Sequence, residues 1–177
     1  MPRLDSSRRL KRQTILVASF LFLYGVLHLI WAQTQGTWLE RLVIDQGTVA
    51  PAAAVIDVLS PRLGAFAQGN RIVGPVGSLS VRPGCDGTEA MFLLIAAFLV
   101  YPQSIARGAI GLVLGAALVY VVNLLRIVIL FYAARDDRSL FELLHGYVAP
   151  TLLIVLAASF FFFWVSRSVT LEARSHA

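Results

Sequence analysis

The sequence is poor in charged residues and in the residues that bind metals or form disulfides. Only 14% of its 177 residues are charged and 58% are apolar, with three histidines and one cysteine. Ordinary soluble domains have about 25% charged and about 45–50% apolar residues, so this composition excludes one. A single cysteine excludes a disulfide within the chain, and one cysteine with one nearby histidine is too small a ligand set for zinc. No phosphate loop, dinucleotide fingerprint or serine-nucleophile elbow occurs, so we expect no metal and no cofactor.

Long apolar runs dominate the chain instead. A membrane-spanning helix needs about 20 mainly apolar residues, and we predict an all-α integral membrane protein with about four transmembrane helices. One further run, Val49–Leu59, is too short to span and predicts an interfacial or re-entrant helix. The predicted spans are 14–32, 87–102, 109–134 and 147–166, built on the apolar runs Thr14–Ala32, Thr88–Tyr101, Ala109–Ala134 and Tyr147–Ser166.

Basic residues before the first run predict the orientation. Although the formal net charge is +5, five cations crowd the first twelve positions, which favours a membrane rather than nucleic acid as the partner. Residues 1–13 are therefore predicted to be cytoplasmic, and the first run is longer than a signal-peptide core, which favours an uncleaved anchor. Four spans in the inner (cytoplasmic) membrane then place 33–86 and 135–146 on the periplasmic or exterior side, and 102–108 and 167–177 in the cytoplasm. The cations are Arg3, Arg8, Arg9, Lys11 and Arg12.

The outer segment 33–86 has internal order just before the second span. Arg71–Val73 and Ser78–Arg82 alternate or carry β-branched residues on either side of the turn signal GPVG. This pattern predicts a small β-hairpin that delivers the chain to Cys85.

Polar side chains from three spans are predicted to lie at one level of the membrane. Cys85 enters from outside at the start of the second span, Arg126 nears the outside in the third, and His145 precedes the fourth. Asn123 lies three residues before Arg126 and shares its helix face. Each of the three has a simpler interpretation: a buried apolar-type cysteine, a snorkelling or helix-bridging arginine, and an interfacial histidine.

Together these residue types suit acyl transfer to a thiol. A nearby imidazole or guanidinium lowers a thiol pKa from about 8.5 towards neutrality, and we expect this for Cys85. His145 can act as base and then as acid for a leaving amine, and Arg126 can stabilise an oxyanion. Gly84 and Gly87 would let a substrate backbone approach the sulfur, and the amides after Cys85 could add oxyanion donors.

Other residues are supporting candidates. Glu89 lies one helical turn after Cys85, and it or Asp86 is expected to orient His145, to contact Arg126, or simply to be solvated or paired. The remaining candidates are Arg71 and Arg82 as substrate, lipid or interface residues, His28 near the outer end of the first span, and Gly108, Gly111 and Gly115 as helix-packing positions.

Three motifs carry a resemblance to a known family. PGCDGTEAMFLL, NLLRIVILFY and HGYVAPTLLI occur in this order on successive predicted spans. They resemble the exosortase/archaeosortase family of membrane transpeptidases over about residues 80–155, and the small size is most similar to the short, single-domain exosortase H type. The resemblance implies that Cys85, Arg126 and His145 form the active site.

The resemblance also implies a substrate class. Family substrates are exported proteins whose C-terminal tail has a short motif, a transmembrane helix and a basic cluster, and the expected motif for the H type resembles IPTLxxWG. The implied reaction cleaves this tail through a thioester and passes the protein to an amine acceptor, such as a membrane lipid.

Two other functions stay open at this point. A cysteine peptidase that hydrolyses the thioester with water would use the same residues. A non-enzymatic membrane assembly protein would instead tolerate the loss of Cys85 and of Arg126.

Overall fold

The protein is built almost entirely of long apolar helices, as predicted. The computed structural model describes residues 3–75, 77–82 and 84–175, with side chains for residues 8 onward and up to 167. Four helices in this part of the chain are long and apolar enough to cross a membrane, and the all-α membrane fold is confirmed. They are Arg8–Gln33, Trp38–Leu59, Ile105–Asp136 and Arg138–Arg167, so three of them contain predicted spans. Trp38–Leu59, whose apolar part was predicted to be too short to span, takes the place of the predicted span 87–102. The elements are α1 (Arg3–Gln33), α2 (Trp38–Arg41), η1 (Leu42–Val49), α3 (Ala50–Leu59), η2 (Pro61–Leu63), β1 (Phe66–Gln68), β2 (Arg71–Gly74), β3 (Gly77–Ser80), α4 (Thr88–Val100), α5 (Ile105–Asp136), α6 (Arg138–Leu143), η3 (Leu144–Val148) and α7 (Ala149–Ser175).

The helices of the bundle match the expected apolar runs with one difference in length. α1, α5 and the continuous run from α6 to α7 contain three of the predicted spans. α4 matches the fourth run but has 13 residues, and it is therefore about 20 Å long at 1.5 Å per residue. It is shorter than the roughly 30 Å hydrocarbon core of a bilayer.

Two segments outside the predicted spans are more helical than predicted. Trp38–Leu59 forms one helical run of 22 residues through α2, η1 and α3, so the segment around Val49–Leu59 is longer than its apolar stretch predicted. Asp45 and Gly47, which interrupt the apolar pattern, lie in the π-helical segment η1. The predicted outer loop 135–146 is also mostly helical. Only one residue, Asp137, separates the end of α5 from the start of α6.

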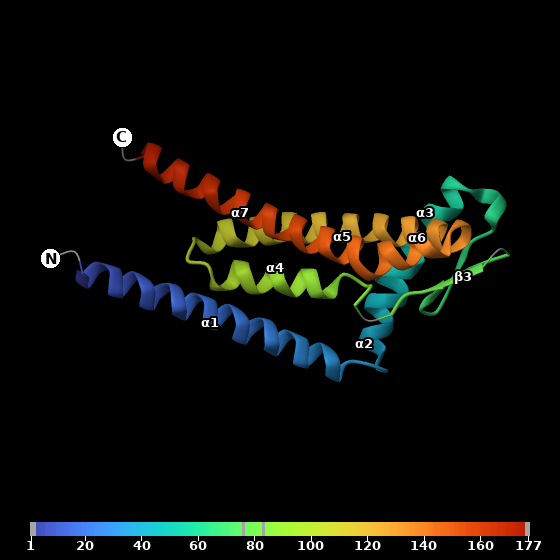
Figure 1. The fold of residues 1–177 in the computed structure, drawn as a ribbon, viewed down its shortest axis with the longest axis horizontal. Coiled ribbons are helices and arrows are strands. Elements are labelled where there is room, and N and C mark those ends of the chain that lie inside the picture. Colours follow the sequence, from blue (N-terminus) through green and yellow to red (C-terminus); the bar gives the residue numbers. More distant parts are fainter. Residues whose placement is uncertain (1–2, 76, 83, 176–177) are drawn as a thin grey trace.

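The bundle has two distinct ends. In Figure 1, α1, α4, α5 and α7 run along the long axis, with both chain ends and the α4–α5 connection at one end. The opposite end carries α2, α3 and the strands, and the chain enters α4 and leaves α5 there. The two glycines Gly111 and Gly115 let α5 pack closely, since a methyl group at Gly115 would lie 2.6 Å from Leu94 and 2.7 Å from Phe160. Their predicted packing role is confirmed.

The small sheet extends the predicted hairpin by one strand. β2 and β3 pair antiparallel with Gly74 opposite Gly77, and β1 pairs with the other edge of β2. Val76, in the predicted turn, lies outside the described residues. An apolar core lies between the sheet, α3 and α5, where Ile56, Ile72 and Ile127 are almost fully buried. This core fixes the sheet against the end of α5, beside the loop that carries Cys85.

Candidate active site

Cys85 and His145 meet at the end of the bundle that carries the sheet. Cys85 lies in the loop between β3 and α4, and His145 lies in the π-helical turn η3 before α7. The Sγ atom of Cys85 is 3.7 Å from Nδ1 and 3.7 Å from Nε2 of His145, within reach of a sulfur hydrogen bond. Residues 60 positions apart are thus in contact, at the common level expected from the order of the spans.

The His145 ring is held by a neighbour that the sequence interpretation missed. Phe141 of α6 stacks on the imidazole with the ring centroids 5.2 Å apart and the planes 9° from parallel. The spacing of four residues could have suggested this contact, because such residues share a helix face. Asp137 precedes α6 as its N-cap, and its carboxylate accepts hydrogen bonds from the amides of Ser139 at 2.8 Å and Leu140 at 3.1 Å.

The Cys85 loop is organised by Asp86. Its buried carboxylate accepts hydrogen bonds from the Gly84 amide at 3.2 Å and from the Thr88 hydroxyl at 2.9 Å. The Thr88 amide also donates to the same oxygen at 3.4 Å, so the first amide of α4 is occupied within the protein. The Cys85 amide donates to the Arg82 carbonyl at 2.9 Å. Asp86 therefore shapes the turn before α4.

Gly87 is required by close packing of the loop on α5. Its φ of +82° lies in the left-handed region that favours glycine. A methyl group there would lie 2.7 Å from Cγ of Asn123, which is itself 4% exposed. Gly84 also has a positive φ, of +92°, and Glu89 lies over it, with Oε1 3.6 Å from the position of an added methyl. Backbone geometry thus accounts for both glycines.

Arg126 brings a buried positive charge to the site. Its side chain is 7% exposed, and within the described part of the chain its Nε has no hydrogen-bond partner. It lies close enough for its charge to act on both Cys85 and His145. An intramembrane guanidinium is costly and normally pairs with another group, so a free buried donor beside a thiol is suited to bind a substrate oxygen.

The resting thiol differs from the expectation of a lowered pKa. Burial raises the pKa of the Cys85 thiol, the positive charge of Arg126 opposes this rise, and the negative charges of Asp86 and Glu89 add to it. The expected effect of Arg126 is therefore present, but the loss of solvation outweighs it. Cys85 is therefore protonated at neutral pH, and a base would have to remove this proton before the sulfur could act as a nucleophile.

The remaining candidates lie around this centre without joining it. Glu89 is exposed, and among the described residues it makes no hydrogen bond to His145 or Arg126. His28 lies between α1 and α4, where its Nε2 is 2.9 Å from the Tyr24 hydroxyl and its ring packs edge-on against Phe92. Arg71, at the start of β2, and Arg82, two residues after β3, are both exposed.

These features define a multi-pass membrane protein with a cysteine–histidine centre and a buried arginine at one end of its bundle. The model of the transmembrane exosortase family matches residues 6–165 of the chain. The protein belongs to this family, as the three motifs indicated. No curated protein and no solved structure matches the chain.

Proposed function

We propose that this protein is a membrane cysteine transpeptidase. The observation that carries the proposal is the 3.7 Å contact between the Cys85 sulfur and the His145 ring, beside the buried guanidinium of Arg126. Membership of the transmembrane exosortase family supports a function of the transpeptidase type. The short exosortase H type, to which the motifs are most similar, is the proposed subgroup.

The reaction would begin with a neutral thiol. His145 accepts the proton of Cys85 as the sulfur attacks the peptide carbonyl, and Arg126 stabilises the oxyanion that forms. The peptide C–N bond then breaks, His145 returns the proton to the leaving amine, and the substrate remains as a thioester on Cys85. An acceptor amine attacks this thioester and gives a proton to His145, the C–S bond breaks as the new amide forms, and His145 returns the proton to the released Cys85 sulfur.

The proposed substrates are exported proteins with a C-terminal motif, a transmembrane helix and a basic cluster. The proposed acceptor is an amine, with a membrane lipid as one source. We propose that the protein lies in the inner membrane with Cys85 towards the periplasm or exterior. Such an arrangement would let a helix-anchored tail diffuse in the bilayer and present its cleavage site at the level of the thiol.

Co-expression with a reporter that bears such a tail tests the proposal. Tail removal is read by mass spectrometry for the wild type and for Cys85→Ala, Cys85→Ser, Arg126→Ala and His145→Ala. Loss of the base is expected to slow cleavage by about 10²–10⁴-fold, and loss of the oxyanion donor by about 10²–10³-fold. His28→Ala is the matched control, because this histidine is also in a membrane helix but pairs with Tyr24.

The mass of the product separates the alternatives. A mass increment on the new C-terminus supports transfer to an acceptor, whereas a free carboxylate identifies a peptidase that hydrolyses the thioester. If folded Cys85→Ala removes the tail as fast as the wild type, the thiol mechanism is wrong and a non-enzymatic assembly role is favoured.

A further inference from the structure

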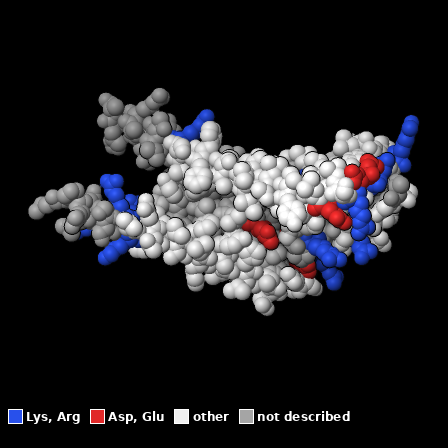
Figure 2. Space-filling view, in the orientation of Figure 1, with Lys and Arg blue, Asp and Glu red and all other residues white. Residues whose placement is uncertain are grey.

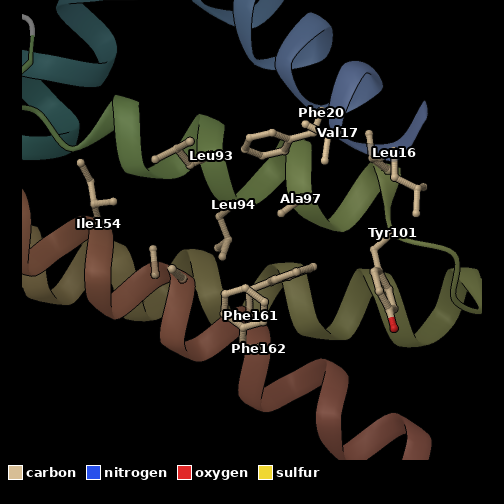
Figure 3. Close-up of a pocket in the computed structure, with 13 residues that line it drawn as sticks. Leu16, Val17, Phe20, Leu93, Leu94, Ala97, Tyr101, Ile154, Phe161 and Phe162 are labelled. Carbon is tan, nitrogen blue, oxygen red and sulfur yellow. The ribbon is translucent and has the colours of Figure 1, made fainter. Parts of the chain in front are cut away.

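An apolar cavity of about 420 Å³ lies within the bundle, among α1, α4 and α7. Figure 3 shows Phe20 of α1 on one side of α4 and Phe161 and Phe162 of α7 on the other. In Figure 2 the surface is hollowed between α1 and α7. None of the described residues that line the cavity is charged. Residues that line it include Leu16, Phe20, Ala97, Tyr101, Ala158 and Phe161.

The cavity lies towards the end of the bundle opposite Cys85. Its α4 side extends from Leu93 to Tyr101, the residue that ends the helix. From Leu93 to Tyr101 the chain rises eight times about 1.5 Å, or about 12 Å. This length is close to the roughly 15 Å thickness of one leaflet, half of the hydrocarbon core. The cavity therefore has about the depth of a single leaflet and lies in the half of the bundle nearer to both chain ends.

The end of the bundle next to the cavity carries positively charged side chains. Arg12 lies one turn before Leu16 and shares its face of α1, and Lys11 is adjacent; both are exposed. Arg167 lies at the same end of α7, with its guanidinium 4.4 Å from the Phe163 ring centroid. The acidic residues with described side chains all lie towards the other end, as the red side chains in Figure 2 show.

We propose that this cavity binds one acyl chain of an anionic glycerophospholipid, with the lipid phosphate against Arg12 and Lys11. The apolar walls match the chain, and the cations match the headgroup, because basic clusters between membrane helices attract anionic lipids. The binding is independent of the reaction at Cys85.

Native mass spectrometry of the full chain, released from nanodiscs of phosphatidylglycerol and phosphatidylcholine, tests the proposal. We expect one retained phosphatidylglycerol, and a loss of about tenfold when Ala158→Trp fills the cavity. Ala117→Trp is the matched control, since Ala117 is exposed on α5 and does not line the cavity. Ala97→Phe fills the cavity from α4 and replaces Ala158→Trp if the latter does not fold.

The contribution of the lipid headgroup is tested separately. Lys11→Gln with Arg12→Gln is expected to lower the preference for phosphatidylglycerol over phosphatidylcholine about tenfold, while Arg107→Gln at the same end, on α5, leaves it unchanged. Equal retention in Ala158→Trp and Ala117→Trp would show that the chain is not in the cavity. Equal retention of both lipids by the wild type, or displacement of the lipid by a tail helix, would also overturn the proposal.

Discussion

Burial and nearby charges shift the pKa of the Cys85 thiol in opposite directions. Burial and the carboxylates of Asp86 and Glu89 raise its pKa, whereas Arg126 lowers it. A thiol of this kind is protected from oxidation while it waits for substrate, because the thiolate is the reactive form. In the proposed reaction, its reactivity would depend on proton transfer to His145 rather than on a permanent ion pair.

The pH dependence of Cys85 alkylation by iodoacetamide tests this balance. The thiolate reacts, so the rate rises with pH through the thiol pKa. Arg126→Gln removes the influence that lowers the pKa and is expected to shift the midpoint to higher pH. Asp86→Asn removes one that raises it and is expected to shift the midpoint to lower pH. Loosening of the fold would relieve burial and lower both midpoints, so a downward shift in Arg126→Gln would contradict the assignment.

Gly87 gives a second test at the scale of single residues. Gly87→Ala combines a positive φ with a methyl group 2.7 Å from Asn123 Cγ, and is expected to lower the free energy of unfolding by about 1–3 kcal/mol. Gly25→Ala is the control, because Gly25 lies in α1 with nothing within 4 Å of the added methyl. A helical glycine-to-alanine change is expected to be neutral or stabilising. Thermal unfolding in detergent, with equal midpoints for the two variants, would show that the loop is not packed as described.

At the scale of elements, α6 positions the histidine. α6 carries Phe141, and its first turn is capped by Asp137. Hydrogen bonds from Ser139 and Leu140 lower the pKa of the Asp137 carboxyl, so the cap is complete above the ordinary carboxyl pKa and is lost as the pH falls through the lowered value. The orientation of the His145 ring therefore depends on a cap eight residues earlier.

Hydrogen exchange measures this dependence. In Asp137→Ala, amides of residues 138–143 are expected to exchange faster, because the first turn loses its acceptor. Asp136→Ala is the control, since the Asp136 carboxylate pairs with Arg135 and does not cap α6. Unchanged protection in Asp137→Ala would mean that the stacking of Phe141 and His145 alone maintains the turn.

The sequence predicted helices well where apolar runs were long and uninterrupted. It did not predict α6 or the start of the Trp38–Leu59 run, because Arg138, Glu142, Asp45 and Gly47 break the apolar pattern while the helix continues. These segments are stabilised by packing, with Ile44, Val49 and Ile56 buried against the sheet core. Tertiary contacts of this kind are not visible in local periodicity.

For the site, the sequence predicted which side chains would approach one another but not their electrostatics. The order of the helices placed Cys85 and His145 at the same end, and their sulfur–nitrogen distance is 3.7 Å. The direction of the thiol pKa was wrong, because it depends on how deeply the loop is buried against α5. That burial is a property of the folded chain and has no local sequence signal.

At the scale of the whole molecule, the two ends of the bundle should face opposite sides of the membrane. In a Cys85→Ser background, Gln68→Cys lies on β1 beside the site, and Ser104→Cys lies at the α4–α5 connection. We expect a membrane-impermeant maleimide to label Gln68→Cys in intact cells and Ser104→Cys only after permeabilisation. The reverse pattern would contradict the orientation that the N-terminal cations predict.

The π-helical turn at Leu144–Val148 contains His145 and affects the direction in which its side chain points. Such a turn holds one residue more than an α-helical turn, so deletion of Gly146 would let one regular helix form. Because the extra residue is taken up within this one wider turn, α6 and α7 keep about the phase of an uninterrupted helix on either side of it. Side chains inside the turn, His145 among them, take directions that a regular helix would not give them. The extra residue, together with the stacked ring of Phe141, therefore turns the imidazole towards the sulfur.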